Sequence, residues 1–130
     1  MSGFSDYLED KVLDHVFGGN AFTAPPTLHV ALFTVAPTDT GGGTEVSGGS
    51  YARQTATFNV SGTNPTTATN AAAVEYPTAT ADYGTVVAVG IFDASSSGNL
   101  LAYAALTANK TVSSGDVFRF DAGDLDITLA

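Results

Sequence analysis

Cysteine and tryptophan are absent from this 130-residue sequence, and charged residues make up only 13% of it. Without cysteine the chain has neither disulfides nor thiolate metal sites, so its composition carries no information on a redox compartment. Ser, Thr, Ala and Gly take the place of the missing charged residues. Because such side chains have little rotamer freedom to lose, a surface made of them is suited to permanent packing against neighbouring subunits.

Basic residues are particularly scarce. The chain has four, Lys11, Arg53, Lys110 and Arg119, against 13 acidic residues, and its formal net charge is −9. Binding to a phosphate backbone requires clustered lysine and arginine side chains, whereas these four are scattered. The charge pattern therefore predicts no nucleic-acid partner.

Signals for export or membrane insertion are missing as well. The opening MSGFSDYLEDK is acidic and lacks the apolar core of a signal peptide. No apolar run reaches the roughly 18 residues needed to cross a bilayer. We expect a soluble protein without a membrane partner, made in the cytoplasm. Its length suits one domain, so residues 1–130 are predicted to form a single β-sandwich domain, with residues 1–19 as an N-terminal helix and arm.

A helical pattern covers residues 4–17, where apolar residues recur every four positions. Ser2 or Ser5 is placed to cap its start, and Gly18 is placed to end it. A helix of about 14 residues is marginal alone in water, so it must pack either on its own sandwich or on another chain. The residues predicted to bind a partner are Phe4, Tyr7, Leu8 and Val12.

The remainder of the chain alternates short apolar runs with turn signals such as SSSGN, TANK, SSGD and DAGD. This spacing predicts an all-β fold, an antiparallel β-sandwich or jelly-roll-like fold of seven to eight strands with one short N-terminal helix. In LHVALFT both faces carry apolar residues, which indicates a central strand. The expected strands are 28–34, 51–58, 71–76, 85–92, 99–106, 110–113 with 117–120, and 124–129.

Two polar segments are predicted to be loops, 37–50 (PTDTGGGTEVSGGS) and 59–70 (NVSGTNPTTATN). The first segment contains three consecutive glycines, and glycine-rich runs of this kind also occur in phosphate-binding loops. However, no Lys-Ser/Thr pair and no helix follow them here, so we predict no nucleotide cofactor.

Catalytic patterns are lacking. The sequence has no G-x-S-x-G motif, and its two histidines, His15 and His29, show no zinc-ligand spacing. We therefore predict no enzymatic activity, no cofactor and no metal. The rival interpretation for a metal is a calcium site formed by Asp121, Asp124 and Asp126, whose carboxylates lie at short spacing.

The segments MSGFSDYLEDKVLDHVFGG, FTAPPTLHVALFTVAPTDTGGGTEVSGGSYARQ, IFDASSSGNLLAYAALTANKTVSSGD and FDAGDLDITL together resemble a family of small tailed-bacteriophage virion proteins. The resemblance runs over nearly the whole chain, and LHVALFT, SGGSYAR and GIFDA carry it best. Members are commonly labelled phage tail fibre proteins, and some resemble capsid decoration (cement) proteins with a β-sandwich or jelly-roll fold. The resemblance implies a virion structural protein.

Physical requirements differ between the possible positions on the particle. A decoration protein needs a compact module with a docking element, which one sandwich with an amphipathic helix provides, whereas a fibre needs an extended shaft. We therefore expect a capsid decoration protein that stabilises the head shell from the outer capsid surface and assembles in the host cytoplasm. Its expected partners are the major capsid protein and itself, as a homo-oligomer, trimer or dimer.

The alternative is a tail fibre or other tail-associated protein involved in host adsorption. A host glycan would then be a partner, and its recognition would require an exposed aromatic platform. The candidate platform residues are Tyr51, Tyr76 and Tyr83.

Overall fold

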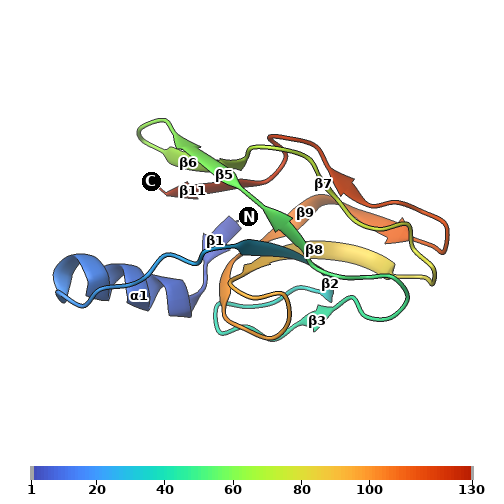
Figure 1. The fold of residues 1–130 in the computed structure, drawn as a ribbon, viewed down its shortest axis with the longest axis horizontal. Coiled ribbons are helices and arrows are strands. Elements are labelled where there is room, and N and C mark those ends of the chain that lie inside the picture. The colour runs from blue at the N-terminus through green and yellow to red at the C-terminus, as the bar shows by residue number, and fades with distance from the viewer. Residues whose placement is uncertain (1, 130) are drawn as a thin grey trace.

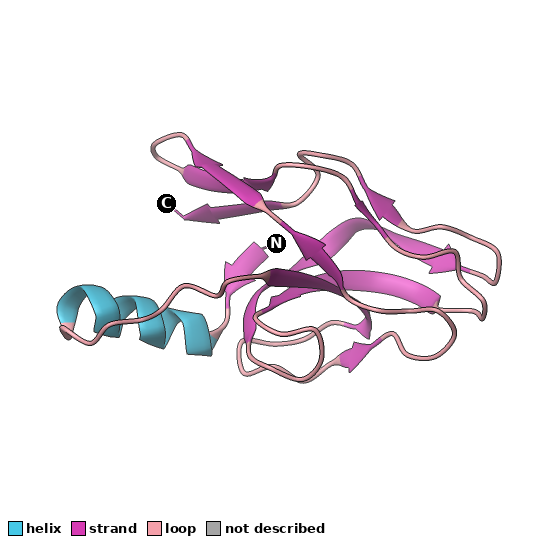
Figure 2. Cartoon of the chain, in the orientation of Figure 1, coloured by secondary structure: helices cyan, strands magenta, loops and turns pink. Residues whose placement is uncertain are grey.

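The computed structural model describes residues 2–129 and has the predicted all-β class with one short helix (Figure 2). The helix is α1 (Asp6–Phe17). The strands are β1 (Ser2–Phe4), β2 (Leu28–Val35), β3 (Thr44–Glu45), β4 (Gln54–Ala56), β5 (Phe58–Ser61), β6 (Thr66–Asn70), β7 (Val74–Glu75), β8 (Gly84–Phe92), β9 (Leu100–Val112), β10 (Arg119–Phe120) and β11 (Asp126–Leu129).

The strands form two layers, with α1 projecting from one end (Figure 1). One layer is a sheet with the order β1-β9-β8-β2-β3, in which β4 also pairs with β2. The other layer consists of the pair β10-β7 and the three-stranded sheet β11-β6-β5. The buried core between them contains Val30, Leu32, Val46, Val74, Tyr76, Ala79, Tyr83, Val86, Val89, Val112, Phe118, Phe120 and Leu125.

Strand β2 is a central strand, as its sequence predicts. It pairs with β8 along one edge and with β3 and β4 along the other. Val30 and Leu32 point into the main core, while Ala31 and Phe33 belong to a smaller cluster on the opposite face of the sheet. Both faces of this strand are covered, which explains its continuous apolar sequence.

Strand β9 is longer than its sequence pattern indicates. Residues 99–106 and 110–113 are predicted as separate strands, but one strand runs from Leu100 to Val112. The ladder with β8 shifts register between Val86 and Ala88, so pairing resumes at Lys110 without a turn. The TANK segment is therefore strand, because an irregularity in the ladder accommodates its extra residues.

The prediction of a loop over residues 59–70 is wrong. This segment forms most of a hairpin, in which β5 pairs with β6 and β6 pairs in turn with β11. Threonine is β-branched and suits a pleated strand, while its hydroxyl suits the solvent-facing side of a sheet. Polar composition alone therefore misled the assignment. The predicted strands at 51–58 and 71–76 are correspondingly short, and contribute β4 and β7.

The N-terminal segment is a strand followed by a helix. Ser2–Phe4 pairs with β9, and Ser5 then caps the helix, because its Oγ accepts a hydrogen bond of 3.2 Å from the Leu8 amide. The buried Ser5 also donates its hydroxyl to the Leu100 carbonyl, which fixes the start of the helix to β9. Gly18 ends the helix, as predicted, and its amide donates to the Asp14 carbonyl at 2.9 Å. No helix between residues 2 and 129 is long and apolar enough to cross a membrane.

Candidate functional site

The residues predicted to bind a partner lie at the base of the projecting helix. Phe4 is in β1, and Tyr7, Leu8 and Val12 are on α1. All four side chains are half-buried against their own chain, and none of the helix residues is fully buried. Part of the surface of each side chain is therefore covered by the chain itself. Their binding of a partner stays a prediction.

The far end of α1 is the most exposed apolar surface of this arm. Leu13, Val16 and Phe17 all project into solvent, and Phe17 is 82% exposed. The helical pattern predicted over residues 4–17 contains all three residues but did not single out Phe17. Its position directly before two glycines, at the end of an amphipathic helix, is the signal in the sequence that could have identified it.

This exposed end is held in shape by the segment that returns from it. The Phe22 amide donates to Nδ1 of His15 at 3.1 Å, and Nδ2 of Asn20 donates to Oδ1 of Asp14 at 2.9 Å. The Phe22 ring also packs edge-on against Tyr7, with 6.5 Å between the ring centroids. His15 therefore has a structural role, and the apolar end of the helix is presented on a braced arm.

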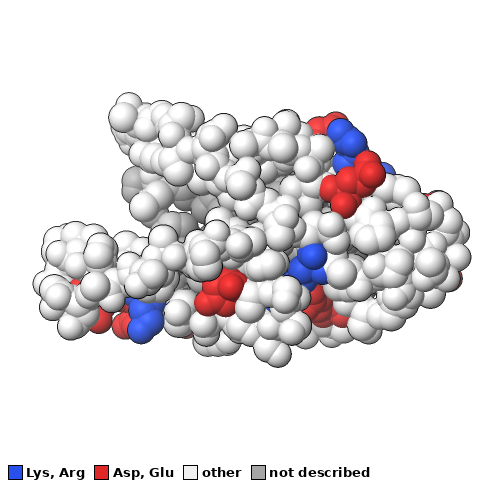
Figure 3. Space-filling model, in the orientation of Figure 1, with Lys and Arg blue, Asp and Glu red and all other residues white. Residues whose placement is uncertain are grey.

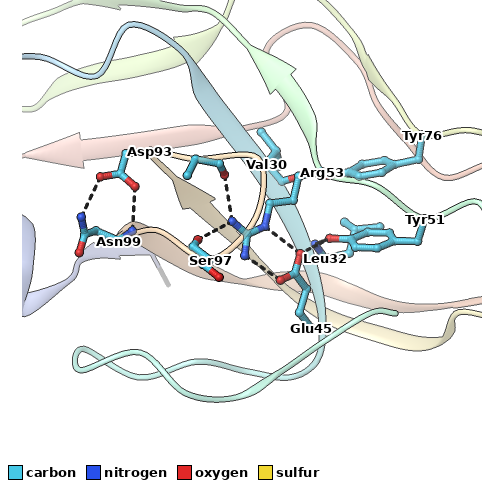
Figure 4. Close-up of polar contacts among 10 residues, drawn as sticks. Val30, Leu32, Glu45, Tyr51, Arg53, Tyr76, Asp93, Ser97 and Asn99 are labelled. Atoms are coloured by element: carbon cyan, nitrogen blue, oxygen red, sulfur yellow. Dashed lines mark hydrogen bonds and ion pairs between the residues drawn. The ribbon is translucent and has the colours of Figure 1, made fainter. Parts of the chain in front are cut away.

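The most specific polar arrangement surrounds Arg53, whose side chain is only 7% exposed (Figure 4). Its guanidinium donates to both carboxylate oxygens of Glu45, at 2.9 and 2.8 Å. It also donates to the carbonyls of Ala94 and Ser97, at 2.9 and 2.8 Å. Its charge lies 3.8 Å from the centroid of the Phe92 ring. One side chain thus holds β3, the segment before β4 and the β8–β9 loop together.

Glu45 is shared between Arg53 and a tyrosine. The Tyr51 hydroxyl donates to the Glu45 carboxylate at 2.7 Å and accepts the Leu32 amide at 3.0 Å. Partial burial of the Glu45 carboxyl acts to raise its pKa, but the hydrogen bonds from Arg53 and Tyr51 outweigh burial and hold the pKa below its usual value. Burial, together with the hydrogen bond to Glu45, raises the pKa of Tyr51. Both residues keep fixed protonation states near neutral pH, which suits a structural role.

This pKa shift predicts a pH dependence of stability. Because the pKa of Glu45 is lower in the folded chain, its stabilising contribution is complete above the ordinary value of 4.5. The contribution is lost as the pH falls from there through the lower folded-state pKa. We expect the Glu45→Gln variant to lose less stability on acidification than the unchanged protein does. Urea unfolding at neutral and at acidic pH measures this, and equal losses in both proteins would contradict it.

The three tyrosines proposed as a glycan platform do not form one. Tyr76 and Tyr83 are buried in the main core, and Tyr51 packs against both of their rings. The Tyr76 hydroxyl donates to the Val30 carbonyl at 2.7 Å. The Phe92 ring is also in contact within the chain, since the Arg53 guanidinium lies over it and Phe33 stacks on it. The prediction that Tyr51, Tyr76 and Tyr83 form an exposed platform is therefore wrong, because these rings fill the space between the sheets.

The three aspartates considered for calcium are engaged within their own turn and sheet. Asp121 accepts from Nε of Arg119 at 2.8 Å, and Asp124 accepts from the Asp121 amide at 3.0 Å. Asp126 accepts from the Thr69 hydroxyl at 2.9 Å. Within residues 2–129, no three His, Cys, Asp or Glu side chains are grouped so as to hold a metal ion.

Asn70 organises this same region and was not predicted from the sequence. Its side chain is buried, with Nδ2 donating to the carbonyls of Ala72 and Asp121 and Oδ1 accepting the amides of Gly123 and Leu125. A single asparagine therefore ties the turn before β11 to β6. The asparagine lies in a polar run that contains several similar residues, so nothing in the local sequence distinguishes it.

Together these features describe a rigid scaffold with an exposed arm. The described residues leave no buried side-chain nitrogen or oxygen without a hydrogen-bond partner. These buried side-chain groups therefore all form hydrogen bonds. His29 is a half-buried residue of β2 opposite Phe92. The arrangement is suited to making contacts with other proteins.

Comparison with known proteins identifies a relationship over most of the chain. A family model described as "Podophage GP4 fiber I protein gp80" matches residues 3–128. No curated protein matches the sequence.

Proposed function

This chain belongs to the family described as Podophage GP4 fiber I protein gp80, and from that premise we propose that it is a structural subunit of a phage fibre. The family is one of phage structural proteins and not an enzyme family, so the proposed function is assembly into the particle. The observation that supports the proposal best is the uncovered apolar end of α1, formed by Leu13, Val16 and Phe17.

An apolar surface on a projecting helix is suited to attachment. Exposed apolar patches mark sites of protein contact, and an amphipathic helix commonly lies in an apolar groove of its partner. We propose that the partner is another protein of the same particle. Asp6, Glu9 and Asp10 are exposed on the first half of the helix. The groove is therefore expected to carry basic residues beside its apolar floor.

Replacing Phe17 by aspartate tests this attachment. Since Phe17 makes little contact with its own chain, we expect the free energy of unfolding to fall by no more than about 1 kcal/mol, the cost of an acidic residue at the end of a helix. Incorporation into particles should nevertheless fall strongly, because the charge would have to enter an apolar groove. Immunoblots of purified virions assembled with the variant measure incorporation.

The matched control is Val117→Asp, which places the same charge at another exposed apolar position, away from the helix. This variant should enter particles normally. Phe17→Asp particles that contain the usual amount of the protein would show that the end of α1 is not the attachment site.

Capsid decoration is the second candidate. Its support is the surface rich in small side chains and the compact sandwich, which suit a module that covers a shell in many copies. Gold-labelled antibodies viewed on intact virions distinguish the two positions. Label confined to fibres supports the fibre proposal, while label spread over the head, together with heat-sensitive heads when the protein is missing, supports decoration.

A further inference from the structure

The strand β5 (Phe58–Ser61) has an open edge. It pairs with β6 along one side, and the described residues place no strand along its other side. The hairpin that contains it extends at one end of the upper layer (Figure 1). Such an edge presents main-chain N–H and C=O groups that are free to pair with another strand.

The strand β5 itself lacks two of the features that usually prevent pairing, charged residues and proline. Edge strands are commonly protected by charged residues, proline or a covering segment. In contrast, residues 54–74 contain no Asp, Glu, Lys or Arg. Within β5, Val60 is 71% exposed. Phe58, two residues earlier and on the same face of the strand, packs against the main core. The surface around the hairpin is correspondingly uncoloured in Figure 3.

The alternation of hydrogen bonds along the β5–β6 ladder identifies which main-chain groups of β5 face its open edge. The Ala71 amide donates to the Thr57 carbonyl at 2.8 Å, so this pair bonds across the hairpin. In an antiparallel ladder such pairs alternate with pairs that do not bond each other. In the register observed, Asn59 and Ser61 therefore bond toward β6. The main-chain groups of Phe58 and Val60 face the open edge.

We propose that a second copy of this chain pairs with the open edge through its own β5, antiparallel and related by a two-fold axis. In the register centred on Asn59, Phe58 lies opposite Val60 of the second copy. The main-chain groups of both residues face the open edge. In each Phe58–Val60 pair, each residue therefore donates its N–H to the C=O of the other. The exposed Val60 side chain then packs beside the Phe58 ring of the second copy, a favourable cross-strand combination.

Charge explains why the occupant is a second copy at this particular edge. Each copy carries a net charge of −9, so two copies repel each other wherever their carboxylates are brought close. The uncharged segment 54–74 allows close approach without that repulsion. An antiparallel contact also places equal numbers of donors and acceptors opposite each other, because the two surfaces are identical. This inference holds for either position on the particle.

Sedimentation velocity of the whole chain over a wide concentration range provides the test. We expect a reversible shift from the monomer mass of 13.2 kDa to twice that mass as concentration rises. Val60→Pro should abolish the shift, because it removes the outward amide while sparing the ladder with β6. Val60→Lys should do the same, because it places a charge beside the Phe58 ring of the second copy and brings the two lysines to diagonal positions. The control is Val117→Lys, which makes the same change elsewhere and should leave the dimer intact.

Circular dichroism and thermal unfolding establish that the variants remain folded, and Val60→Lys keeps the test valid if the proline disturbs the hairpin. A chain that stays monomeric at every concentration would overturn the proposal. So would a trimer or dimer that persists in both folded Val60 variants, since it would use a different surface. Cross-linking of Val60 to another virion protein, with no self-association, would assign the edge to that protein and would equally overturn the proposal.

Discussion

Replacing Arg53 by methionine is expected to lower the free energy of unfolding by about 3 kcal/mol, the low end of the range found when one partner of a buried ion pair is removed, because Glu45 is 26% exposed. Methionine fills much of the same space but donates no hydrogen bonds. Glu45 would lose its ion-pair partner, and the carbonyls of Ala94 and Ser97 would lose their donor. The loss of stability should be accompanied by loosening of the β8–β9 loop, which Arg53 fixes to β3 and to the segment before β4.

Guanidinium chloride unfolding measures this effect, and hydrogen exchange of the loop amides reports the loosening. Arg119→Met is the matched control, because Arg119 also pairs with carboxylates but is 50% exposed. An exposed pair typically contributes no more than about 1 kcal/mol, so the control should be nearly neutral. Equal effects of the two substitutions would show that the Arg53 network contributes no more than a surface ion pair.

Replacing Asn70 by leucine is expected to have an effect of similar size. Leucine has the same number of side-chain heavy atoms and the same branch point as asparagine. It leaves the amides of Gly123 and Leu125 and the carbonyls of Ala72 and Asp121 without their partner. Each buried group left without a hydrogen bond costs about 1–3 kcal/mol. Since some of these groups would regain water, we expect a total loss of at least about 3 kcal/mol.

The same unfolding measurement tests this prediction, with Asn109→Leu as the control at an exposed position of β9. Surface substitutions of this kind change stability by about 0.5 kcal/mol or less. A second variant, Asn70→Asp, retains an acceptor for the two amides but loses both donors. We expect it to unfold more easily than the unchanged protein and less easily than Asn70→Leu. A fully stable Asn70→Leu protein would mean that the turn before β11 holds its shape without this side chain.

Local patterns were sufficient for the strongly apolar elements. The period of two in LHVALFT, with both faces apolar, indicated a central strand, and β2 is central. Gly18 was recognised as a helix end from residue type alone, and Ser5 was one of two candidate caps, because capping depends on groups within one turn of the helix. The strand β8 was placed correctly at its C-terminal end for the same reason, since its residues alternate between two covered faces.

The polar elements and the site could not be found in the same way. The β5–β6 hairpin has the composition of a loop, and it becomes a sheet only because β11 pairs with β6 from the far end of the chain. The tyrosines look equally suitable for a surface and for a core, and their burial was decided by the distance between the two layers. Arg53 and Asn70 were not singled out, because their partners lie in segments remote in sequence.

By itself, the sequence determined the fold class, the capped N-terminal helix and the resemblance to phage virion proteins that the family match bears out. These properties depend on the order of apolar and polar residues over short stretches, which the sequence displays directly. The tertiary structure alone decided that Phe17 projects into solvent, that Tyr76 is buried and that β5 keeps an open edge. Burial and strand pairing depend on which distant segments meet, because the same side chain is core or surface according to what packs against it.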